Sequence, residues 1–422
     1  MNSIFISLSP NAFVQDVRLA FRLLFSPWSW KKGRQAEWLE KEFADYLSGV
    51  EAISFESGRS SWYEILKALD IKAGDEVLVQ SFSCVVVPNS ILWTGAKPVY
   101  VDIDPKTLNM DLGDLEKKIN IRSKVILVQH TFGLPQDMNR IIQIANKYNL
   151  QVVEDCAHAL GAELKNNKGE WQKVGTFGEA AFFSFGRDKV ISSVHGGMAV
   201  SRHENLAKRL RKQQQALKYP SFGWIFQQLM HPVWMFMVKE LYYIGSIGKV
   251  LLVLLQKMGL MSKAVQPIEK KGARPKVHPR RLANAQAELA RAQFARLDEF
   301  NASRRSVAAR YRAELQLDGA EHLLESENTR PIYMRYNLLT RQARQLIQEA
   351  RSQAMLLGNW YSPAMAPSGV DCRAIFYDPD TCPIAEDASA KVVNLPTYPL
   401  MKEEDVDRVI ELVRDVLQKE DL

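Results

Sequence analysis

The sequence predicts an α/β fold with a mostly parallel sheet covered by helices on both faces, followed by a smaller α+β domain. Short apolar segments recur between residues 74 and 200, separated by helical or loop segments. They are β-branched or aromatic on both faces, which is typical of parallel strands buried on both sides. After residue 278 the pattern changes to a long Ala/Arg/Glu-rich helix, a mixed region and a closing helix, which predicts the second domain.

Five segments of the first region have the character of strands. They are residues 76–79, 98–103, 124–130, 151–155 and 180–185. Residues 138–149 predict a crossover helix, because Ile141, Ile142 and Ala145 share one face. Ligands of open α/β sheets lie at the carboxyl ends of the strands, so the residues that end these segments are the first candidates for a functional site.

The second region predicts two helices. Residues 282–315 contain neither Gly nor Pro and predict a long helix that is continuous or broken once. The closing helix begins near Glu403 and carries one apolar stripe. The stripe consists of Val406, Val409, Ile410, Val413 and Leu417.

Two further segments are unusually hydrophobic. Residues 12–25 predict an amphipathic helix, with Asn11 as its cap. Residues 223–255 combine aromatic and aliphatic side chains with three charged residues, a proline and several glycines. A membrane-spanning helix needs about 20 nearly uncharged residues, so a simple span is disfavoured. Burial in a subunit interface, a lid over the active site and a patch lying in the membrane interface all stay open.

The composition sets limits on partners and compartment. Of the 422 residues 46% are hydrophobic and 24% charged, and the net charge of +7 suits a nucleotide, a phosphate cofactor or an acidic membrane surface. Compact Lys/Arg runs interleaved with aromatics are absent from the sequence, so nucleic acid is disfavoured. The four cysteines form no CxxC pair, and we find no signal peptide. We therefore expect no metal and a cytoplasmic protein, membrane-associated if residues 223–255 contact lipid.

A lysine and an aspartate end two of the predicted strand segments. Residues 181–189 (AFFSFGRDK) end at Lys189, and residues 151–158 (QVVEDCAH) place Asp155 at the strand end. Pyridoxal phosphate (PLP) chemistry requires these two groups. A lysine forms the internal Schiff base, and a carboxylate keeps the pyridine nitrogen protonated so that the ring acts as an electron sink. Alone, each residue is more often a surface lysine or a turn aspartate, but together with the surrounding motifs they favour PLP.

Several motifs accompany this pair in a fixed order. They are Ser57-Gly-Arg-Ser-Ser61, Gly74-Asp-Glu-Val77 with Ser81-Phe-Ser-Cys84, Glu154-Asp-Cys-Ala-His-Ala-Leu-Gly161, Gly175-Thr-Phe-Gly178, His195-Gly-Gly197 and Asn394-Leu-Pro-Thr-Tyr-Pro399. In order and spacing they resemble the DegT/DnrJ/EryC1/StrS family. Its members are fold-type I PLP enzymes, mostly aminotransferases acting on keto-sugars attached to nucleotides. The resemblance runs from about residue 35 to the end, except for roughly 213–277.

The resemblance implies a fold and a division into domains. Fold type I has a large domain with a mostly parallel seven-stranded sheet between helices, and a smaller C-terminal α+β domain. We therefore expect an N-terminal amphipathic segment, a large PLP-binding domain, a hydrophobic helical insertion and a small C-terminal domain. These divisions are residues 1–34, 35–212, 213–277 and 278–422.

The resemblance also implies site residues. Lys189 matches the Schiff-base lysine, which also moves a proton between substrate and cofactor, and Asp155 matches the partner of the pyridine nitrogen. The other cofactor-binding matches are His158 near the cofactor O3′, Ser184 at the phosphate, Gly58, Arg59 and Ser60 in the phosphate loop, Cys84 against the ring, and Arg281 reaching the phosphate of the neighbouring subunit of a homodimer.

Three positions depart from the family's pattern. Arg59 lies in a loop where the family more often has Gly-Thr, so it adds a charged contact or points away. Cys84 replaces an aromatic ring that stacks on the cofactor, with Phe82 or Trp93 as candidates to compensate. Pro279-Arg-Arg281 keeps the arginine of the family's Asn-x-Arg but lacks the asparagine. Residues 213–277 exceed the family's usual connection, and we expect the features particular to this protein there.

The resulting expectation is a PLP-dependent aminotransferase. It would transfer an amino group from glutamate, with PMP formed on the way, to a keto-sugar in the synthesis of surface polysaccharide or a related glycan. The acceptor would be nucleotide-linked, or membrane-linked if the hydrophobic insertion serves that purpose.

Two alternatives differ in class. A PMP-dependent sugar dehydratase is disfavoured, because relatives of that type replace the lysine with histidine and His195 lies six residues too late. A catalytically inactive sensor or scaffold is favoured by Cys84 and Pro279. It is disfavoured by the retention of Asp155, Ser184 and Lys189, which a scaffold does not need.

Overall fold

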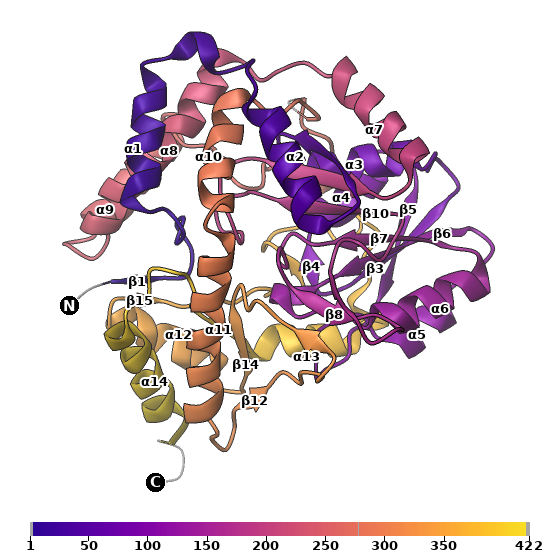
Figure 1. The fold of residues 1–422 in the computed structure, drawn as a ribbon. Helices are drawn as coiled ribbons and strands as arrows, with labels where there is room; N and C mark the ends of the chain where they lie inside the picture. The colour runs from indigo at the N-terminus through magenta and orange to yellow at the C-terminus, as the bar shows by residue number, and fades with distance from the viewer. Residues whose placement is uncertain (1–2, 277, 419–422) are drawn as a thin grey trace.

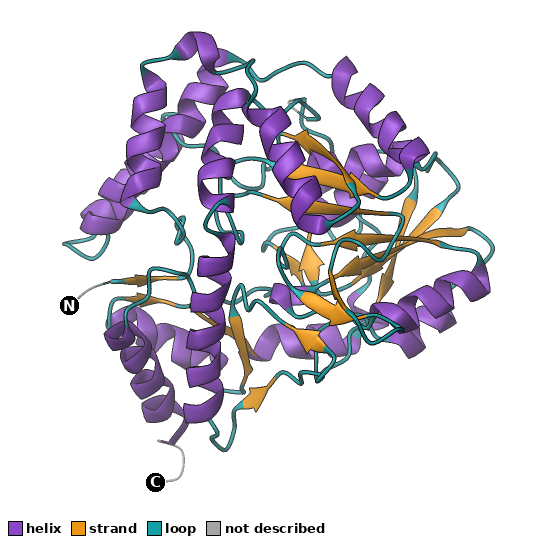
Figure 2. Cartoon of the chain, viewed as in Figure 1, coloured by secondary structure: helices purple, strands orange, loops and turns teal. Residues whose placement is uncertain are grey.

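The computed structural model describes residues 3–276 and 278–418, and a seven-stranded sheet forms its centre (Figures 1 and 2). The strand order is β2 (Glu51–Phe55), β11 (Gly197–Ser201), β10 (Ala180–Ser184), β7 (Gln151–Asp155), β6 (Ser123–Gln129), β3 (Glu76–Gln80) and β5 (Lys97–Val101). β11 is antiparallel to both of its neighbours, and the other pairs are parallel. The predicted mostly parallel sheet is confirmed, and each predicted strand agrees with an observed one to within two residues.

Helices cover both faces of the sheet, because its strands are apolar on both faces. In β6, Val125 and Leu127 pack into one buried cluster, whereas Ile126 and Val128 pack into another on the opposite face. The surrounding helices are α2 (Gln35–Leu47), α3 (Gly58–Ala68), α4 (Val86–Leu92), α5 (Leu112–Lys118), α6 (Met138–Tyr148) and α7 (Glu204–Ala216). The predicted crossover helix is α6, which Asp137 caps by accepting a hydrogen bond from the Arg140 N–H.

The C-terminal part of the chain has its own core. The long predicted helix is broken once, between α10 (Asn284–Phe294) and α11 (Leu297–Glu314). The core includes Tyr311, Leu338, Leu346 and Val409. It lies among α11, α12 (Ala343–Ser352), α14 (Glu403–Leu417) and the antiparallel strands β12 (Glu321–His322), β14 (Tyr336–Leu339) and β17 (Val392–Leu395), with α13 (Pro383–Lys391) nearby. This is the smaller α+β part of the predicted fold.

Short strand pairs connect distant parts of the chain. β8 (Glu163–Lys165) lies between β9 (Trp171–Lys173) and β13 (Thr329–Arg330), and β4 (Ser83–Cys84) pairs with β16 (Met365–Ala366). At the N-terminus, β1 (Ile4–Phe5) runs parallel to β15 (Met355–Leu356). The beginning of the chain therefore lies against its C-terminal region (Figure 1).

The N-terminal helix α1 (Val14–Leu24) forms as predicted, but Asn11 is not its cap. The helix begins after Phe13, whose backbone N–H donates to the Asp16 carboxylate at 2.9 Å. Asn11 is buried, and its side-chain amide donates instead to the backbone carbonyl of Lys189. The predicted cap is wrong because a long-range partner competes successfully for the amide.

Residues 213–277, predicted from the sequence as a hydrophobic insertion, contain two surface helices, α8 (Phe222–Leu241) and α9 (Ile247–Lys257). One side of α8 packs on α1 and α10 through Ile225 and Leu229, and on α9 through Met235. Pro232 lies inside α8 without ending it. Among the helices that the structure describes, none is long and apolar enough to cross a membrane.

Candidate active site

A pocket lies at the carboxyl edge of the central sheet. β6, β7 and β10 are neighbouring parallel strands that end at Gln129, Asp155 and Ser184, so these three residues meet at one edge. The lining comprises Gly58, Arg59, Trp62, Ser83, Cys84, Val86, Val87, Gln129, Asp155, Ala157, His158, Phe182, Ser184, Lys189 and Tyr361. Seven of the nine site residues predicted from the sequence belong to this lining, whereas Ser60 and Arg281 do not.

Asp155 is a buried carboxylate at the end of β7. Its Oδ1 accepts a hydrogen bond from the Ala157 N–H at 3.0 Å. Burial raises the pKa of Asp155, and the positive charges of Lys189 and His130 oppose that rise. A buried carboxylate that faces a pocket is stable as an anion only with a cationic or proton-donating partner. A protonated pyridine nitrogen is such a partner.

Lys189 lies on the loop that follows β10. Its N–H donates to the Gly186 carbonyl at 3.2 Å, which closes a tight turn after the strand. Burial lowers the pKa of Lys189, while the Asp155 carboxylate opposes the change. A lysine with a lowered pKa is more often neutral, which is the form that attacks a carbonyl or accepts a proton.

The N-terminal segment and α11 hold this loop in place. Besides the Asn11 contact, the Ser9 N–H donates to Asp188 Oδ1 at 3.1 Å, and Arg304 donates to the Val190 carbonyl at 2.8 Å. The motifs around Lys189 gave no sign of these partners, because they come from residues more than 100 positions away in the sequence. The loop is therefore held by residues of the N-terminal segment and of α11.

The start of α3 fits a phosphate. Ser57 caps the helix by accepting the Ser60 N–H, so the N–H groups of Gly58 and Arg59 remain in the first turn, where an anion is favoured. A side chain at Gly58 would approach Ser184 Cβ to 2.9 Å, so glycine keeps the space between the helix and Ser184 free. Ser60 points away, because its hydroxyl donates to Glu56 at 2.7 Å.

Arg59 connects the pocket to the insertion. Its guanidinium forms an ion pair with the buried Glu269 at 2.6 Å and donates to the Ala264 carbonyl at 3.1 Å. The sequence left open whether Arg59 adds a charged contact or points away. Arg59 does make a charged contact, and its partners lie in residues 213–277, the predicted insertion. The segment after α9 therefore lies at the rim of the pocket.

The part of the pocket that was predicted to face the cofactor ring differs from the prediction. Cys84 lines it, and burial raises the pKa of its thiol. Neither Phe82 nor Trp93 is among the lining residues, so they do not replace the missing aromatic ring. Tyr361, which the sequence gave no reason to select, does line the pocket.

His158 and Tyr361 form an aromatic stack with Phe132. The rings of Phe132 and His158 are nearly parallel with centroids 5.5 Å apart, and the Tyr361 hydroxyl lies 3.4 Å from His158 Nε2. Burial holds the pKa of His158 well below its usual value, so the imidazole is neutral. Tyr361 lies in a loop before β16, far from Lys189 in the sequence and outside every motif, which explains why it was missed.

A second cationic residue, Arg335, lies close to this pocket. It borders a small cavity together with Asp188 and Lys189, and its side chain is 5% exposed. The guanidinium carbon lies 3.5 Å from the centre of the Trp360 ring. Burial lowers the pKa of Arg335 to about 10. In residues 3–276 and 278–418 no carboxylate forms an ion pair with this guanidinium, and the charge of Asp188, which borders the same small cavity, partly offsets its own.

The chemistry of these side chains fits PLP. Asp155 suits the pyridine nitrogen, Lys189 suits the reactive carbonyl, and the first turn of α3 with Ser184 suits the phosphate. The free space between these side chains is about 70 Å³. PLP would therefore enter only if side chains such as that of Lys189 moved aside.

Another cluster of side chains contains the residue types that bind metal ions, but its contacts within the protein already explain it. His130, Glu154 and Cys156 lie together and are buried. The Glu154 carboxylate, however, already accepts hydrogen bonds from the backbone N–H groups of Gly175, Phe177 and Gly178, and lies 3.2 Å from His130. These contacts fully explain Glu154 as the residue that shapes the turn before β10.

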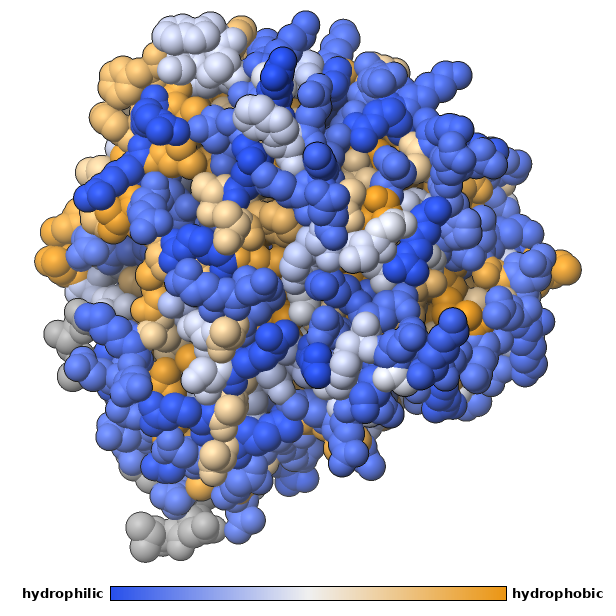
Figure 3. All heavy atoms as spheres, viewed as in Figure 1, coloured by the Kyte–Doolittle hydropathy of each residue, from blue (hydrophilic) through white to orange (hydrophobic). Residues whose placement is uncertain are grey.

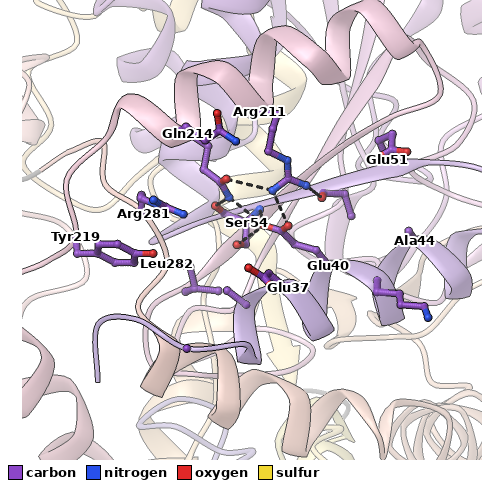
Figure 4. Close-up of a pocket in the computed structure, with 15 residues that line it drawn as sticks. Glu37, Glu40, Ala44, Glu51, Ser54, Arg211, Gln214, Tyr219, Arg281 and Leu282 are labelled. Atoms are coloured by element: carbon purple, nitrogen blue, oxygen red, sulfur yellow. Dashed lines mark hydrogen bonds and ion pairs between the residues drawn. The ribbon is translucent and has the colours of Figure 1, made fainter. Parts of the chain in front are cut away.

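Arg281 lies in a different pocket of about 580 Å³ (Figure 4). Its guanidinium carbon is 4.5 Å from the centre of the Tyr219 ring, and the same pocket contains the Arg211–Glu40 ion pair of 2.6 Å. Arg281 thus does not reach the Lys189 pocket of its own chain. Its predicted contact with the phosphate of a neighbouring subunit stays a prediction.

Comparison with known proteins decides the family. The model of the DegT/DnrJ/EryC1/StrS aminotransferase family matches residues 15–414. The chain belongs to this family. The family and the enzyme class predicted from the motifs, an aminotransferase, are therefore confirmed.

Similar proteins cover nearly the whole length of this family member. GDP-perosamine synthase from Escherichia coli O157:H7 is 28% identical over 403 residues, which are 93% of each chain. UDP-N-acetyl-3-dehydro-alpha-D-glucosamine 3-aminotransferase from Acidithiobacillus ferrooxidans is 28% identical over 396 residues, which are 91% of this chain and 89% of the relative. The solved structure of S. venezuelae DesV superposes with a TM-score of 0.76 at 24% identity and covers 99% of both chains, which confirms the fold.

Proposed function

We propose that this aminotransferase uses PLP to move an amino group from glutamate to a keto-sugar, nucleotide-linked, in the synthesis of a surface polysaccharide or related glycan. The observation that carries the proposal is that the buried Asp155 and the half-buried Lys189 line one pocket at the carboxyl edge of the sheet. The names of the relatives, which describe enzymes of GDP-, UDP- and dTDP-sugars, support the acceptor class.

Each group in the pocket has a defined task. Bound PLP would supply an electron sink for the carbon that gains or loses the amino group. Asp155 would hold the pyridine nitrogen in its protonated form. Because the carboxylate is buried, its interaction with the protonated nitrogen would be strong and specific. The first turn of α3 and Ser184 would hold the phosphate, and neutral His158 would lie beside the ring oxygen without adding a positive charge.

Lys189 would serve as the base of the reaction. Its lowered pKa increases the neutral fraction of the amine near neutral pH, so it can take a proton from the substrate carbon and return it. The contacts from Ser9, Asn11 and Arg304 fix the backbone of its loop. Because the backbone of the loop is fixed while the lysine side chain can move, the amine can reach both atoms between which it carries the proton.

Arg335 would bind a carboxylate of the amino donor. A guanidinium that is stacked on Trp360 and borders the same small cavity as Lys189 would be able to donate two hydrogen bonds to a carboxylate. An acidic donor would neutralise this buried charge, whereas a donor without the matching carboxylate would leave it unpaired. The position thus favours glutamate over neutral amino acids.

The second subunit would complete the site. We infer a homodimer in which Arg281 of one chain approaches the phosphate bound by the other, because Arg281 lies outside the Lys189 pocket of its own chain. Arg281 would then be the residue of the family's Asn-x-Arg motif that this chain retains, since Pro279 replaces the asparagine.

The experiment is a spectroscopic half-reaction with the purified full chain. We expect PLP addition to produce a visible absorption band that glutamate shifts to shorter wavelength, with one equivalent of 2-oxoglutarate released per site. Lys189→Ala should lack the response, and Lys173→Ala, a lysine near the rim of the sheet but outside the pocket, should retain it. A band that ignores glutamate and every other amino donor would leave the fold in place but overturn the proposed transfer.

A further inference from the structure

The helices α1, α8 and α9 together carry an apolar surface that no part of the described chain covers. Residues 12–34 and 222–263, here called the α1–α8–α9 surface, contain 14 of the 22 exposed large hydrophobic side chains among the residues that the structure describes. They are Val14, Phe21, Phe25, Trp28, Phe222, Phe226, Phe236, Met237, Ile244, Ile247, Val250, Val253, Leu254 and Met258. Figure 3 shows hydrophobic side chains gathered along the left and upper left of the molecule, where Figure 1 places these helices.

The exposed residues follow the helical repeat. In α9, Ile247, Val250, Leu254 and Met258 are three or four positions apart, and each is between 49% and 69% exposed. In and just after α1, Phe21, Phe25 and Trp28 have the same spacing, with exposed fractions of 53%, 66% and 79%. The residues therefore form stripes, one on each helix, rather than isolated surface side chains.

Only the opposite faces of these helices are used for folding. Ala20 and Leu23 of α1 pack against Ile225 and Leu229 of α8. Further along α8, Met235 packs with Leu255 of α9. Since the folding core already takes one face of each helix, the exposed stripes are not explained by packing within the chain.

The charge of the protein is concentrated at the same place. Residues 12–34 and 222–263 contain nine Lys and Arg residues but only two acidic ones, Asp16 and Glu240, an excess of seven. The whole chain has 55 basic and 48 acidic residues, also an excess of seven. The remainder of the chain is therefore neutral, and Asp16 is buried. Lysines also lie against the aromatic rings, with Lys31 Nζ 4.1 Å from the centre of Phe222 and Lys249 close to Tyr242.

We propose that the α1–α8–α9 surface binds the interfacial layer of an anionic lipid bilayer, with its apolar stripes among the acyl chains near the headgroups and its basic residues on the lipid phosphates. Helices that lie in the plane of a membrane combine these features, with aromatic and aliphatic residues on one face and Lys and Arg beside them. The absence of a spanning helix among the described residues agrees with a protein that lies on the membrane. A second copy of this chain is a poorer occupant, because two such surfaces would bring like charges together.

The test is co-sedimentation of the full chain with vesicles of phosphatidylcholine alone and of phosphatidylcholine mixed with phosphatidylglycerol. We expect binding to the anionic vesicles that weakens as salt is added. Phe21→Ser with Phe25→Ser, and Val250→Ser with Leu254→Ser, should each lower the partition constant by about tenfold or more, since removing one large apolar side chain from an interface changes an equilibrium by about that factor.

Matched controls separate the surface from general hydrophobicity and charge. Ile121→Ser and Leu324→Ser remove exposed apolar residues elsewhere, at 93% and 59% exposure, and should leave vesicle binding unchanged. Lys32→Glu with Lys257→Glu should weaken binding to anionic vesicles, whereas Lys168→Glu with Lys212→Glu, the same charge change outside the surface, should have a much smaller effect.

Three results would overturn the proposal. One is no sedimentation with either vesicle. Another is an equal loss of binding in the surface variants and the controls. The third is a change of molar mass in light scattering when the serine variants are made, with vesicle binding intact, which would assign the surface to contacts between copies of the chain. None of these readouts depends on PLP or on turnover, so they test the surface independently of the proposed reaction.

Discussion

The Lys189 pocket and the α1–α8–α9 surface depart from ordinary protein structure in opposite directions. The pocket buries the Asp155 carboxylate, with the half-buried Lys189 beside it and the buried Arg335 close by, whereas the surface leaves large apolar side chains in water. Each arrangement is unfavourable in the isolated chain, since buried charges need partners and exposed apolar patches attract them. We therefore expect the pocket to bind a small polar ligand, and the surface to bind an extended apolar partner that carries negative charge.

The two regions touch through one polar cluster. Arg187, two residues before Lys189, bonds to Ser262 after α9, and Ser262 donates to Gln228 of α8 at 2.9 Å. Ser9 Oγ, beside the Lys189 loop, lies 3.0 Å from His231 Nε2 of α8. Predictions that affect one region and spare the other therefore test whether the regions are separate in function although they are joined in structure.

The largest expected effect belongs to Lys189→Ala. We expect amino transfer from glutamate to fall by about 1,000-fold or more, because both the covalent attachment and the base are lost. Vesicle binding should not change, since Lys189 lines the pocket and is not one of the exposed apolar residues of the surface. The measurements are 2-oxoglutarate release and vesicle co-sedimentation on the same preparation, and a parallel loss of both would contradict the separation.

Asp155→Asn should have the next largest effect. Removing the charge that holds the pyridine nitrogen should lower amino transfer on the order of 100-fold, as is typical when one preorganised electrostatic partner is removed. The folded-state pKa of Asp155 is raised, so the carboxylate takes up its proton earlier during acidification than an ordinary aspartate. PLP affinity should therefore fall as the pH drops toward that pKa, and a fluorescence titration of Asp155→Asn should show no such dependence.

Arg335→Gln should change the choice of donor. Loss of a charge-assisted hydrogen bond to a carboxylate corresponds to roughly a tenfold to hundredfold rise in KM for glutamate. The rates with alanine, whose side chain offers no second carboxylate, should change less if the guanidinium binds the side-chain carboxylate. Equal changes for both donors would place Arg335 at the common α-carboxylate, and no change in KM for either would remove it from substrate binding.

Asn11→Ala tests how the N-terminal segment supports the Lys189 loop, and we expect the smallest effect from this variant. The buried amide supports the Lys189 loop through its carbonyl, so its loss should destabilise the protein by about 1 kcal/mol and lower kcat several-fold while KM is retained. Thermal unfolding and steady-state kinetics measure the two effects. Asn166→Ala, in the turn between β8 and β9, serves as the comparison, and an equal fall in its kcat would show that the loop is not positioned by Asn11.

The sequence predicted the pocket well because its residues follow strands in ordered motifs. Asp155, Ser184 and Lys189 occur at the ends of apolar segments, and parallel strands bring such ends together. Tyr361 and Arg335 could not be found in this way. They come from the C-terminal part, and their positions depend on how that part packs against the sheet.

The hydrophobic segments were predicted only in part. The helical repeat placed a helix within residues 12–25, but Asn11 was wrongly assigned as its cap because local capping rules do not include a distant carbonyl. For residues 223–255 the composition left burial and membrane contact open, since hydrophobicity alone does not tell which face of a helix is covered. The structure separates the two faces of α8, and the covered one had no marker in the sequence.

The parallel pair of β1 and β15 has a consequence for synthesis of the chain. Ile4 pairs with Met355 and Phe5 with Leu356, so β1 finds its partner only after residues 355–356 have been synthesised. Until then the segment that carries Ser9 and Asn11 is not tied to β15, although its partners in the Lys189 loop and α11 are already present. The large sheet and the Lys189 loop can assemble before the segment that supplies Tyr361 has been made, so a chain that stops short of this segment would have the sheet of the enzyme without its complete pocket.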